Sequence, residues 1–188
     1  LQHANNKKLK VFFLGSTNEV LDSIKIKLET LYPNIISAKF VLGQSIEGRD
    51  IWAFKVSDNP NDNENEPEVL YTSLIHAREP LSMMNLFYFV QKLVEGYNVD
   101  EELTYLVNNR EMWFIPVVNP DGYVFNELIE PFGGGMHRKN RKDTNCGNGT
   151  MRGVDLNRNF SFGWGANNSG SSPDPCSDVY RGESAFSE

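Results

Sequence analysis

The sequence contains no apolar run of the roughly 20 residues that a helix needs to cross a bilayer. It also lacks basic charge, because 18 lysines and arginines stand against 25 aspartates and glutamates, for a net charge of -7. A negative protein repels phosphate backbones, which excludes nucleic acid as the main partner. No internal repeat or low-complexity segment is present. With 188 residues, of which 39% are hydrophobic, the chain suffices for one sizeable core and one domain.

The chain lacks an initiating methionine and a leader in which basic residues precede an apolar stretch. We therefore expect a processed or trimmed product from which any signal peptide or propeptide has been removed.

Cysteine is scarce, since Cys146 and Cys176 are the only two. They bracket a stretch rich in Gly, Asn and Ser, which has little hydrophobic content to hold it. A disulfide there would stabilise the fold by about 3–4 kcal/mol. We predict this bridge, and with it secretion or another oxidising compartment; two free thiols in a cytosolic protein are the alternative. Glycosylation sequons at Asn148, Asn159 and Asn167 agree with secretion and with a glycoprotein.

The pattern of apolar residues predicts alternating helices and strands. Residues 16–19 read as a capping box, and apolar residues then recur at helical spacing until Pro33 ends the segment. Residues 35–43 and 50–57 are rich in β-branched and aromatic side chains, which predicts two adjacent strands. The acidic stretch 58–68 is expected to be a solvent-exposed loop.

The next segments continue the alternation. Val69 to Ile75 is apolar on both faces, as expected of a strand in a sheet covered by helices. Pro80 suits a first helical position, and 100–109 predicts a shorter helix. Residues 112–118 predict a buried strand, and Asn-Pro-Asp-Gly at 119–122 reads as a tight turn. The fold class is therefore α/β, with a mixed, mostly parallel sheet sandwiched by helices.

Residues 75–80 read Ile-His-Ala-Arg-Glu-Pro and place His76 and Glu79 directly after a predicted strand. An imidazole nitrogen and a carboxylate oxygen suit zinc, and a short turn lets both converge on one ion. His76 and Asn119 also lie beyond the carboxyl ends of strands, where such sheets bind ligands. A match to H-x-x-E alone arises by chance in roughly 20% of such chains. A core histidine beside a helix-capping carboxylate is the alternative.

Other motifs occur in order along the chain. They are Gly-Gln-Ser-Ile-Glu-Gly-Arg at 43–49, Asn-Pro-Asp-Gly-Tyr at 119–123, His-Arg-Lys-Asn-Arg at 137–141, Gly-Val-Asp-Leu-Asn-Arg-Asn-Phe at 153–160 and Tyr-Arg-Gly at 180–182. Together with H-x-x-E, they make the chain resemble the zinc carboxypeptidases of the carboxypeptidase A/B type, peptidase family M14, from about residue 16 onward. The resemblance implies a short tail at 1–10 and, at 11–188, the N-terminal part of a catalytic domain truncated on its carboxyl side.

The resemblance also implies roles for individual residues. His76 and Glu79 would bind one Zn²⁺, and Asp155 would orient the histidine by accepting its other ring N–H. Arg138 would polarise the scissile carbonyl and stabilise the oxyanion. An ordinary loop carboxylate is the alternative for Asp155.

The basic cluster at 138–142 stands out in an acidic chain, although such clusters are often only solvated faces. An exopeptidase that acts at the carboxyl end must recognise a free carboxylate, which an arginine fork meets in bidentate fashion. By resemblance, Asn157 and Arg158 would hold that carboxylate. Arg78 would touch the substrate further from the cleaved bond, with a plain salt bridge as the alternative.

Two positions depart from the family pattern. Pro80 and His137 stand where tryptophan is frequent, and neither change removes a catalytic group. If the segment is extended, His137 points away from Arg138 and is not a third zinc ligand. Glycosylation at Asn159 is doubtful, because this residue adjoins Arg158.

The family's third zinc ligand is a histidine beyond 180–182, and its general base is a glutamate further on. No histidine follows His137. Three hypotheses follow: the front portion of a longer carboxypeptidase that acts on peptide or protein C-termini, a non-catalytic relative that binds such ends or a partner, and a half completed by a complementing C-terminal fragment. We expect the first, a hydrolase with one Zn²⁺ per complete domain; the residues that select the terminal side chain would also lie beyond residue 188.

Overall fold

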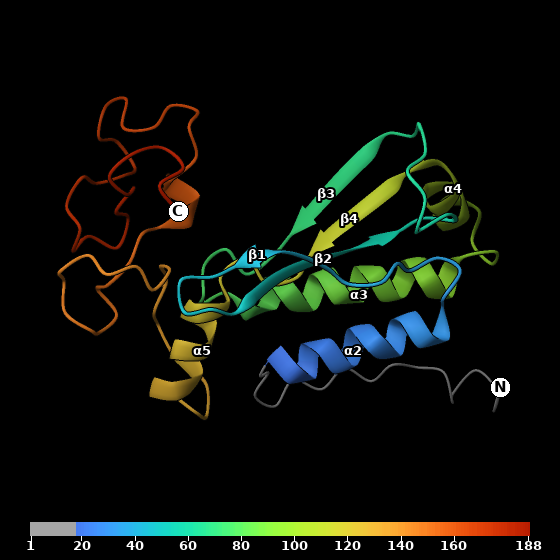
Figure 1. Cartoon of the computed structure of the whole chain (residues 1–188), viewed down its shortest axis with the longest axis horizontal. Helices are drawn as coiled ribbons and strands as arrows, with labels where there is room; N and C mark the ends of the chain where they lie inside the picture. The colour runs from blue at the N-terminus through green and yellow to red at the C-terminus, as the bar shows by residue number, and fades with distance from the viewer. Residues whose placement is uncertain (1–17) are drawn as a thin grey trace.

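The structure is a computed structural model that describes residues 18–188 (Figure 1). Ser16 and Thr17, the first half of the expected capping box, lie outside the described residues. The elements are, in order, α2 (Asn18–Leu31), β1 (Phe40–Gln44), β2 (Asp50–Val56), β3 (Glu68–Thr72), α3 (Pro80–Gly96), α4 (Glu101–Asn109), β4 (Glu111–Ile115), α5 (Pro120–Ile129) and a short 3₁₀ helix η1 (Leu156–Arg158).

The described strands form one mixed sheet in the order β1-β2-β4-β3. β3 and β4 run parallel, because the chain passes through α3 and α4 between them. β1 and β2 are joined by a short turn and are antiparallel, as are β2 and β4. The predicted mixed sheet with helices is confirmed. The expected predominance of parallel pairs does not hold within residues 18–188. The hairpin of β1 and β2 is one antiparallel pair, and β4 lies antiparallel to β2 as another.

The hydrophobic core lies between the sheet and the helices α2 and α3 (Figure 1). Tyr71, Phe114 and Phe54 stack from three neighbouring strands, with ring centroids 5.1 and 5.3 Å apart. The apolar stripe of α3 packs on these rings because its buried residues recur at helical spacing. These α3 residues are Met83, Leu86, Phe87, Val90, Leu93 and Val94. This packing holds the end of β3 and the start of α3 in fixed positions.

Two expectations for individual segments were wrong. Residues 69–75 were expected to be buried on both faces, but Leu70 is 61% exposed. The reason is that β3 is an edge strand of the described sheet, and its second face is open. Residues 119–122 form the start of α5 rather than a tight turn: Asn119 accepts from the backbone N–H of Gly122, and Pro120 is the first helical residue.

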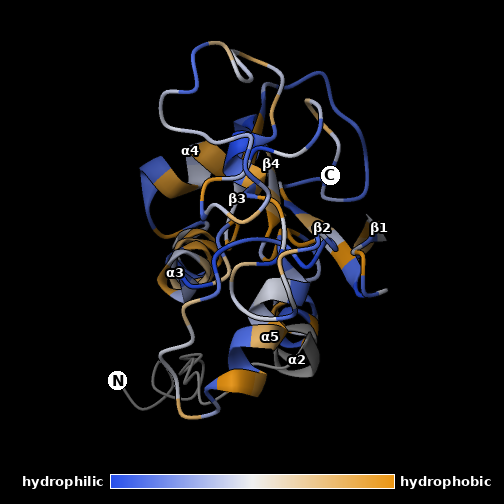
Figure 2. Cartoon of the chain, turned by 90° about the vertical axis from the view of Figure 1, so that its left-hand side faces the viewer, coloured by the Kyte–Doolittle hydropathy of each residue, from blue (hydrophilic) through white to orange (hydrophobic). Residues whose placement is uncertain are grey.

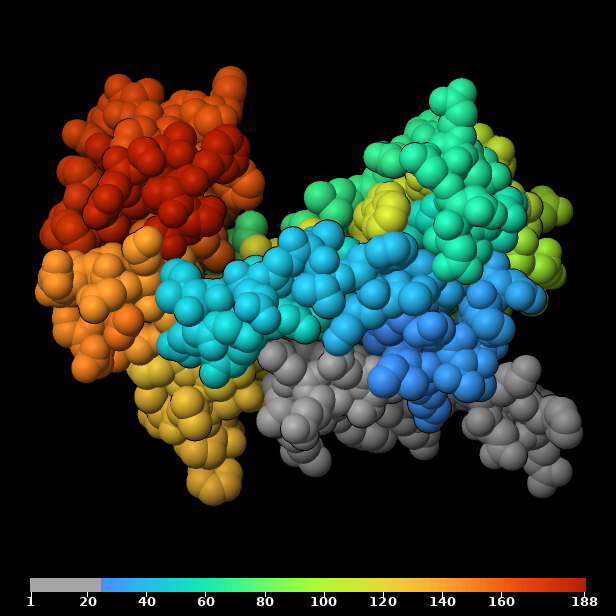
Figure 3. Space-filling model, in the orientation of Figure 1, coloured from blue at the N-terminus to red at the C-terminus, as the bar shows by residue number. Residues whose placement is uncertain are grey.

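The chain after α5 is largely irregular. Figure 2 shows that most of it is hydrophilic, with short hydrophobic stretches between. It is held by the predicted disulfide between Cys146 and Cys176, which is present. The buried Lys139 adds hydrogen bonds to the carbonyls of Pro175 and Ser177, at 3.2 and 2.8 Å. Figure 3 shows a valley between this segment and the strands β3 and β4.

Glycine is required where this segment approaches itself most closely. Gly153 has φ +104°, and a Cβ there would lie 1.9 Å from the carbonyl oxygen of Asn140. The tight approach fixes the strand of chain that leads to Asp155. In the part of the chain that the structure describes, no helix combines the length and apolarity needed to cross a membrane.

Candidate metal and substrate site

His76 and Glu79 lie on the short connection between β3 and α3. Leu74, just before them, is buried with φ +52°, a conformation that costs a bulky residue on the order of 1–3 kcal/mol. Two contacts hold it there: its N–H donates to Oγ of Ser82 at 3.0 Å, and its carbonyl accepts from the N–H of Asn119 at 3.1 Å. The strained residue turns the chain so that His76 leaves the sheet toward Glu79.

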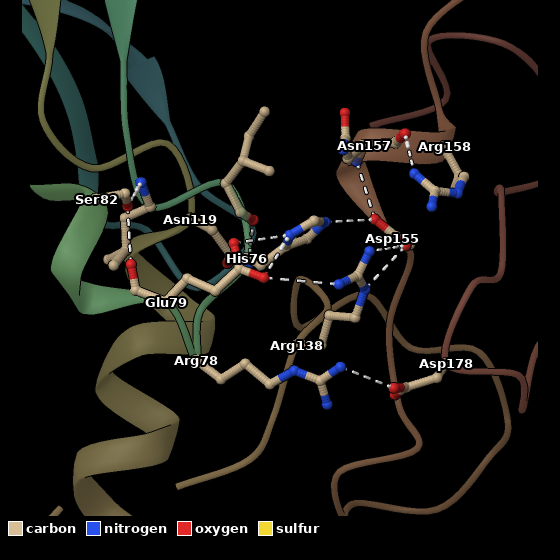
Figure 4. Close-up of polar contacts among 12 residues, drawn as sticks. His76, Arg78, Glu79, Ser82, Asn119, Arg138, Asp155, Asn157, Arg158 and Asp178 are labelled. Carbon is tan, nitrogen blue, oxygen red and sulfur yellow. Dashed lines mark hydrogen bonds and ion pairs between the residues drawn. The ribbon is translucent and has the colours of Figure 1, made fainter. Parts of the chain in front are cut away.

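The ring of His76 is contacted on both nitrogens (Figure 4). Nδ1 faces the carboxylate of Glu79, 3.1 Å from each oxygen. Nε2 lies 3.1 Å from Oδ1 of Asp155. His76 is buried and Asp155 is completely buried, whereas the side chain of Glu79 is about half exposed. The three residues therefore form a row from the interior to the surface.

Asp155 is held in its ionised form. Burial alone would raise the pKa of its carboxyl group, but hydrogen bonds from His76 and Arg138 outweigh burial and lower the pKa below the ordinary value. Arg138 donates from Nε and Nη2 to Oδ2 at 3.0 and 2.9 Å, and the N–H of Asn157 donates to Oδ1 at 3.0 Å. Because an ionised carboxylate only accepts, the proton of a neutral His76 lies on Nε2.

The position of the proton on His76 decides whether Nδ1 is free to bind a metal. With the proton on Nε2, Nδ1 presents a lone pair directly to the carboxylate of Glu79. Two acceptors that face each other across 3.1 Å repel, and either a proton on Nδ1 or a metal cation between them removes that repulsion. An imidazole and a carboxylate are zinc ligands, and the pair fits this metal. A catalytic zinc takes three protein ligands, and the described residues place no third acidic, histidine or cysteine side chain to complete this pair.

Arg138 is brought to the same place by its backbone and its side chain. Its carbonyl accepts from the N–H of Ala77, next to His76, at 3.0 Å. With Nε and Nη2 occupied by Asp155, Nη1 is the remaining end of the fork and lies 3.8 Å from a Glu79 oxygen. The guanidinium thus presents a donor to the space beside His76 and Glu79.

Asn157 and Arg158 belong to η1 and lie on the far side of Asp155 from Glu79 (Figure 4). Arg158 donates to the carbonyls of Gly170 and Asn157, at 2.6 and 2.9 Å, rather than to a carboxylate. Both residues line a hollow of about 300 Å³.

Arg78 lies on the opposite side of the site from Arg158 (Figure 4). It pairs with Asp178 at 3.2 Å and donates to the carbonyl of Met136 at 3.3 Å, so the salt bridge considered for it is present. The structure therefore brings together His76, Glu79, Arg138 and Asp155, with Arg78 and Arg158 at either end.

His137 is separate from this group. Its ring nitrogens face the carbonyls of Thr150 and Asn140, at 3.2 and 3.1 Å. Burial, followed by the nearby charges of Arg141 and Lys139, lowers its pKa. It supports the loop and contributes nothing to the metal pair.

Sequence reasoning missed the side chains that brace the site. The amide of Asn119 donates to the carbonyls of Ile75 and Lys139, at 3.3 and 3.0 Å, and so ties the segment of His76 to that of Arg138. The position of Asn119 after a predicted strand placed it at the ligand-binding edge of the sheet. No sequence signal predicted that its side chain would link the two segments. Ser82 also donates to the carbonyl of Glu79 at 2.8 Å, and no sequence signal marks it.

Comparison with known proteins agrees with this arrangement. The family model described as zinc carboxypeptidase matches residues 22–188. The chain is 41% identical over 136 residues to a zinc carboxypeptidase of Saccharothrix mutabilis subsp. capreolus. It is 37% identical over 171 residues to carboxypeptidase B of Helicoverpa zea.

Solved structures give the same result. Carboxypeptidase A from Helicoverpa armigera superposes with a TM-score of 0.76 at 34% identity and covers 99% of this chain. Thrombin-activatable fibrinolysis inhibitor superposes with a TM-score of 0.73 at 30% identity, over 91% of this chain.

The lengths of these proteins differ from that of the chain. The aligned residues are 72% of the chain but 30% of the Saccharothrix protein, and 90% of the chain but 37% of the Helicoverpa zea protein. They are also 44% of the first solved structure and 40% of the second. The chain thus spans less than half the length of each of these relatives.

Proposed function

The chain belongs to the zinc carboxypeptidase family, and from this premise we propose that it is the N-terminal part, residues 11–188, of the catalytic domain of a zinc metallocarboxypeptidase. The complete enzyme, of the carboxypeptidase A/B branch, removes the C-terminal residue of peptides and proteins by hydrolysis. The branch is supported by the Ala77-Arg78 pair within the zinc motif and by Pro-Val-Val-Asn-Pro at 116–120.

The observation that carries this proposal is the two-sided contact of His76. Asp155 fixes the proton on Nε2, and Nδ1 is thereby directed at the carboxylate of Glu79. This is how a metal-binding histidine is oriented by a carboxylate behind it. A core histidine beside a helix cap would not need a buried, ionised aspartate.

Each residue of the site has a proposed role in hydrolysis. His76 and Glu79 would hold zinc, which would act as a Lewis acid and lower the pKa of a water molecule. Arg138, held by Asp155, donates from Nη1 to the scissile carbonyl oxygen as negative charge develops on it. Asn157 and Arg158 hold the terminal carboxylate, for which Arg158 exchanges its bonds to backbone carbonyls for stronger charged ones.

We further propose that the protein is secreted or resides in another oxidising compartment. The disulfide between Cys146 and Cys176 supports this proposal. Asn148 and Asn167 remain acceptors for a glycan. Asn159 is not, because its buried amide nitrogen donates to Arg181, Ser184 and Ser187.

The experiment that tests the function measures zinc in the full-length protein after dialysis against a weak chelator. His76→Ala and Glu79→Ala are each expected to abolish zinc retention, whereas Arg158→Ala retains it and loses affinity for peptides. The matched substrates are one peptide with a free and one with an amidated carboxyl end. Stoichiometric zinc in both ligand variants contradicts the metal assignment. Equal affinity for the two peptides contradicts the role of Arg158. Peptide binding without any hydrolysis identifies a non-catalytic binding module instead.

A further inference from the structure

Asn148 and Gly149 form an exposed Asn-Gly step within the loop that the disulfide closes. Asparagine is one of the chemically labile residues of proteins. Its side-chain amide can be attacked by the backbone nitrogen of the residue that follows, and glycine obstructs this attack least because it has no Cβ. The two residues therefore suit a reaction within the chain, and their surroundings decide whether it proceeds.

The reacting atoms of this step are not engaged elsewhere. Among the described residues, no hydrogen bond uses the N–H of Gly149 or Nδ2 of Asn148. A Cβ placed at Gly149 would have nothing within 4 Å of it, so the space around this residue is open. The backbone nitrogen can approach Cγ of Asn148 without giving up a hydrogen bond of its own.

Two arginines contact the step. Nη1 of Arg152 donates to Oδ1 of Asn148 at 3.2 Å. When the nitrogen attacks Cγ, negative charge develops on Oδ1, and a guanidinium already bound there stabilises it. Arg141 donates to the carbonyls of Asn148 and Gly149, at 3.2 and 3.3 Å, and its positive charge favours the deprotonated nitrogen that attacks. Both arginines thus lower the barrier to the same reaction.

We propose that Asn148 is a site of spontaneous deamidation, and that a glycan on the same side chain prevents it. The nitrogen of Gly149 bonds to Cγ of Asn148, the bond from Cγ to Nδ2 breaks, and Nδ2 leaves as ammonia with the proton of the attacking nitrogen. One water molecule then opens the succinimide at either carbonyl, which leaves an aspartate or an isoaspartate. The proposal goes beyond the proposed function and requires neither zinc nor hydrolytic activity.

The protection by a glycan follows from the position at which it is attached. Residues 148–150 read Asn-Gly-Thr, so the residue that deamidates is also the acceptor of a sequon. A glycan is carried by Nδ2, the nitrogen that must depart, and a nitrogen that carries a sugar cannot leave as ammonia. Asn148 thus has two mutually exclusive fates.

The isoaspartate product affects the supports of Arg138. Isoaspartate continues the chain through its Cγ and adds one atom to the backbone. Shortly after it, the carbonyl of Thr150 faces Nδ1 of His137 at 3.2 Å, and the carbonyl of Met151 accepts from Nζ of Lys139. His137 and Lys139 flank Arg138 in the sequence. We therefore expect the isoaspartate form to be less stable toward urea than the parent protein.

The test uses the full-length protein with Thr150→Ala, produced in secreting eukaryotic cells and aged at physiological pH and temperature. The substitution removes the sequon but keeps the Asn-Gly step, and the contact of residue 150 with His137 uses a backbone carbonyl that alanine retains. Mass spectrometry of the peptide that contains Asn148 measures conversion of amide to acid, and enzymatic methylation of isoaspartyl groups identifies that product. Both signals should rise with time in this variant and stay at background in unmodified protein that carries the glycan.

Further substitutions in the Thr150→Ala background locate the cause. Gly149→Ala is expected to slow the loss of the amide about tenfold or more, because a side chain obstructs the attacking nitrogen. The chain has open space for this Cβ, so the variant should fold. Arg152→Gln is expected to slow the loss about fivefold, because the charged donor to Oδ1 is removed.

Asn168 is the matched control within the same molecule. Its Oδ1 also accepts from an arginine, Arg181, at 2.7 Å. The residue that follows it, Ser169, has a side chain, and its N–H already donates to Oδ1 of Asn167 at 2.9 Å. Asn168 should therefore keep its amide while Asn148 loses it.

Each contrary result overturns a defined part of the proposal. An Asn148 that keeps its amide in aged Thr150→Ala protein, or loses it equally fast with Gly149→Ala, overturns the site. Equal losses at Asn148 and Asn168 overturn it as well, because the surroundings of Asn148 would then have no effect. An unchanged rate with Arg152→Gln overturns the part of the guanidinium. Unmodified protein without a glycan at Asn148, or glycosylated protein that deamidates equally fast, overturns the protection.

Discussion

Asp155 accepts a hydrogen bond from Nε2 of His76 at 3.1 Å, although the two residues are 79 positions apart in the sequence. The distance in sequence means that the orientation of the proposed zinc ligand depends on a segment that contains neither ligand. The same carboxylate accepts two donors from Arg138. One buried aspartate thus positions both His76, a proposed zinc ligand, and Arg138, the proposed donor for the oxyanion.

Replacing this aspartate tests its role as a positioning residue. Asp155→Asn is expected to weaken zinc binding by about 10–100-fold, because a neutral amide holds the histidine proton less strongly. Competition with a chromophoric chelator measures the affinity in the full-length protein. Asp178→Asn serves as the control, since this carboxylate pairs only with Arg78 among the ion pairs of the described residues. Equal zinc affinity in Asp155→Asn and the unmodified protein would contradict the assignment.

Arg138 and Arg158 are expected to affect different kinetic constants. Arg138→Ala should lower kcat by about 10²–10³-fold, since its donor acts on charge that develops in the transition state. Arg158→Ala should mainly raise KM, because the terminal carboxylate is present throughout the reaction. Steady-state kinetics on one peptide measures both. A loss confined to KM in the Arg138 variant would remove its proposed role.

His137 predicts a dependence of stability on pH. Burial, with the charges of Arg141 and Lys139, lowers its pKa below the ordinary 6.5. The unfolded chain therefore takes up a proton there before the folded chain does, and the free energy of unfolding falls as pH drops below about 6.5. This one group contributes at most about 1.4 kcal/mol per pH unit. Urea denaturation between pH 5 and 8 measures the slope, which His137→Gln should reduce. The same slope in both proteins would show that other groups cause it.

Lys55 and Glu111 form an ion pair at 2.8 Å that is buried in the sheet. Burial alone would raise the pKa of Glu111. The hydrogen bonds from the N–H of Glu64 and the ammonium of Lys55 outweigh burial and lower the pKa below its ordinary value, so the carboxylate is ionised. Glu111→Ala should destabilise the fold by about 3–5 kcal/mol, because the ammonium is left buried without its partner. Lys55→Met combined with Glu111→Leu should recover most of that loss. Chemical denaturation measures both, and a double variant no more stable than Glu111→Ala would contradict the explanation.

Local signals in the sequence predicted the elements well where one interpretation was possible. Pro80 and the apolar stripe behind it predicted the start of α3, which the structure has at that residue. Asn-Pro at 119–120 is typical of both turns and helix starts, and the wrong alternative was chosen. The apolar run after Glu68 suggested burial on both faces, but its position at the sheet edge depends on pairing that a single segment does not encode.

The candidate site divides in the same way. His76 and Glu79 are close in sequence, so a short motif identified them together. Asp155 and Arg138 were assigned by family resemblance, and the structure places both against that motif. The cross-links from Asn119 and Ser82 arise only when distant segments pack, and no spacing in the sequence predicts them.

The separation between His76 and Asp155 has a consequence for the order in which the molecule assembles. The strands β3 and β4 and the helices between them are contiguous in sequence, whereas Asp155 must close a much longer loop. We expect the sheet to form early and the docking of Asp155 to be the last step of folding. The chain that carries Asp155 is largely irregular, so we expect this segment to open before the sheet does in the native state. Metal exchange would then proceed through this local opening, at a rate unrelated to global unfolding.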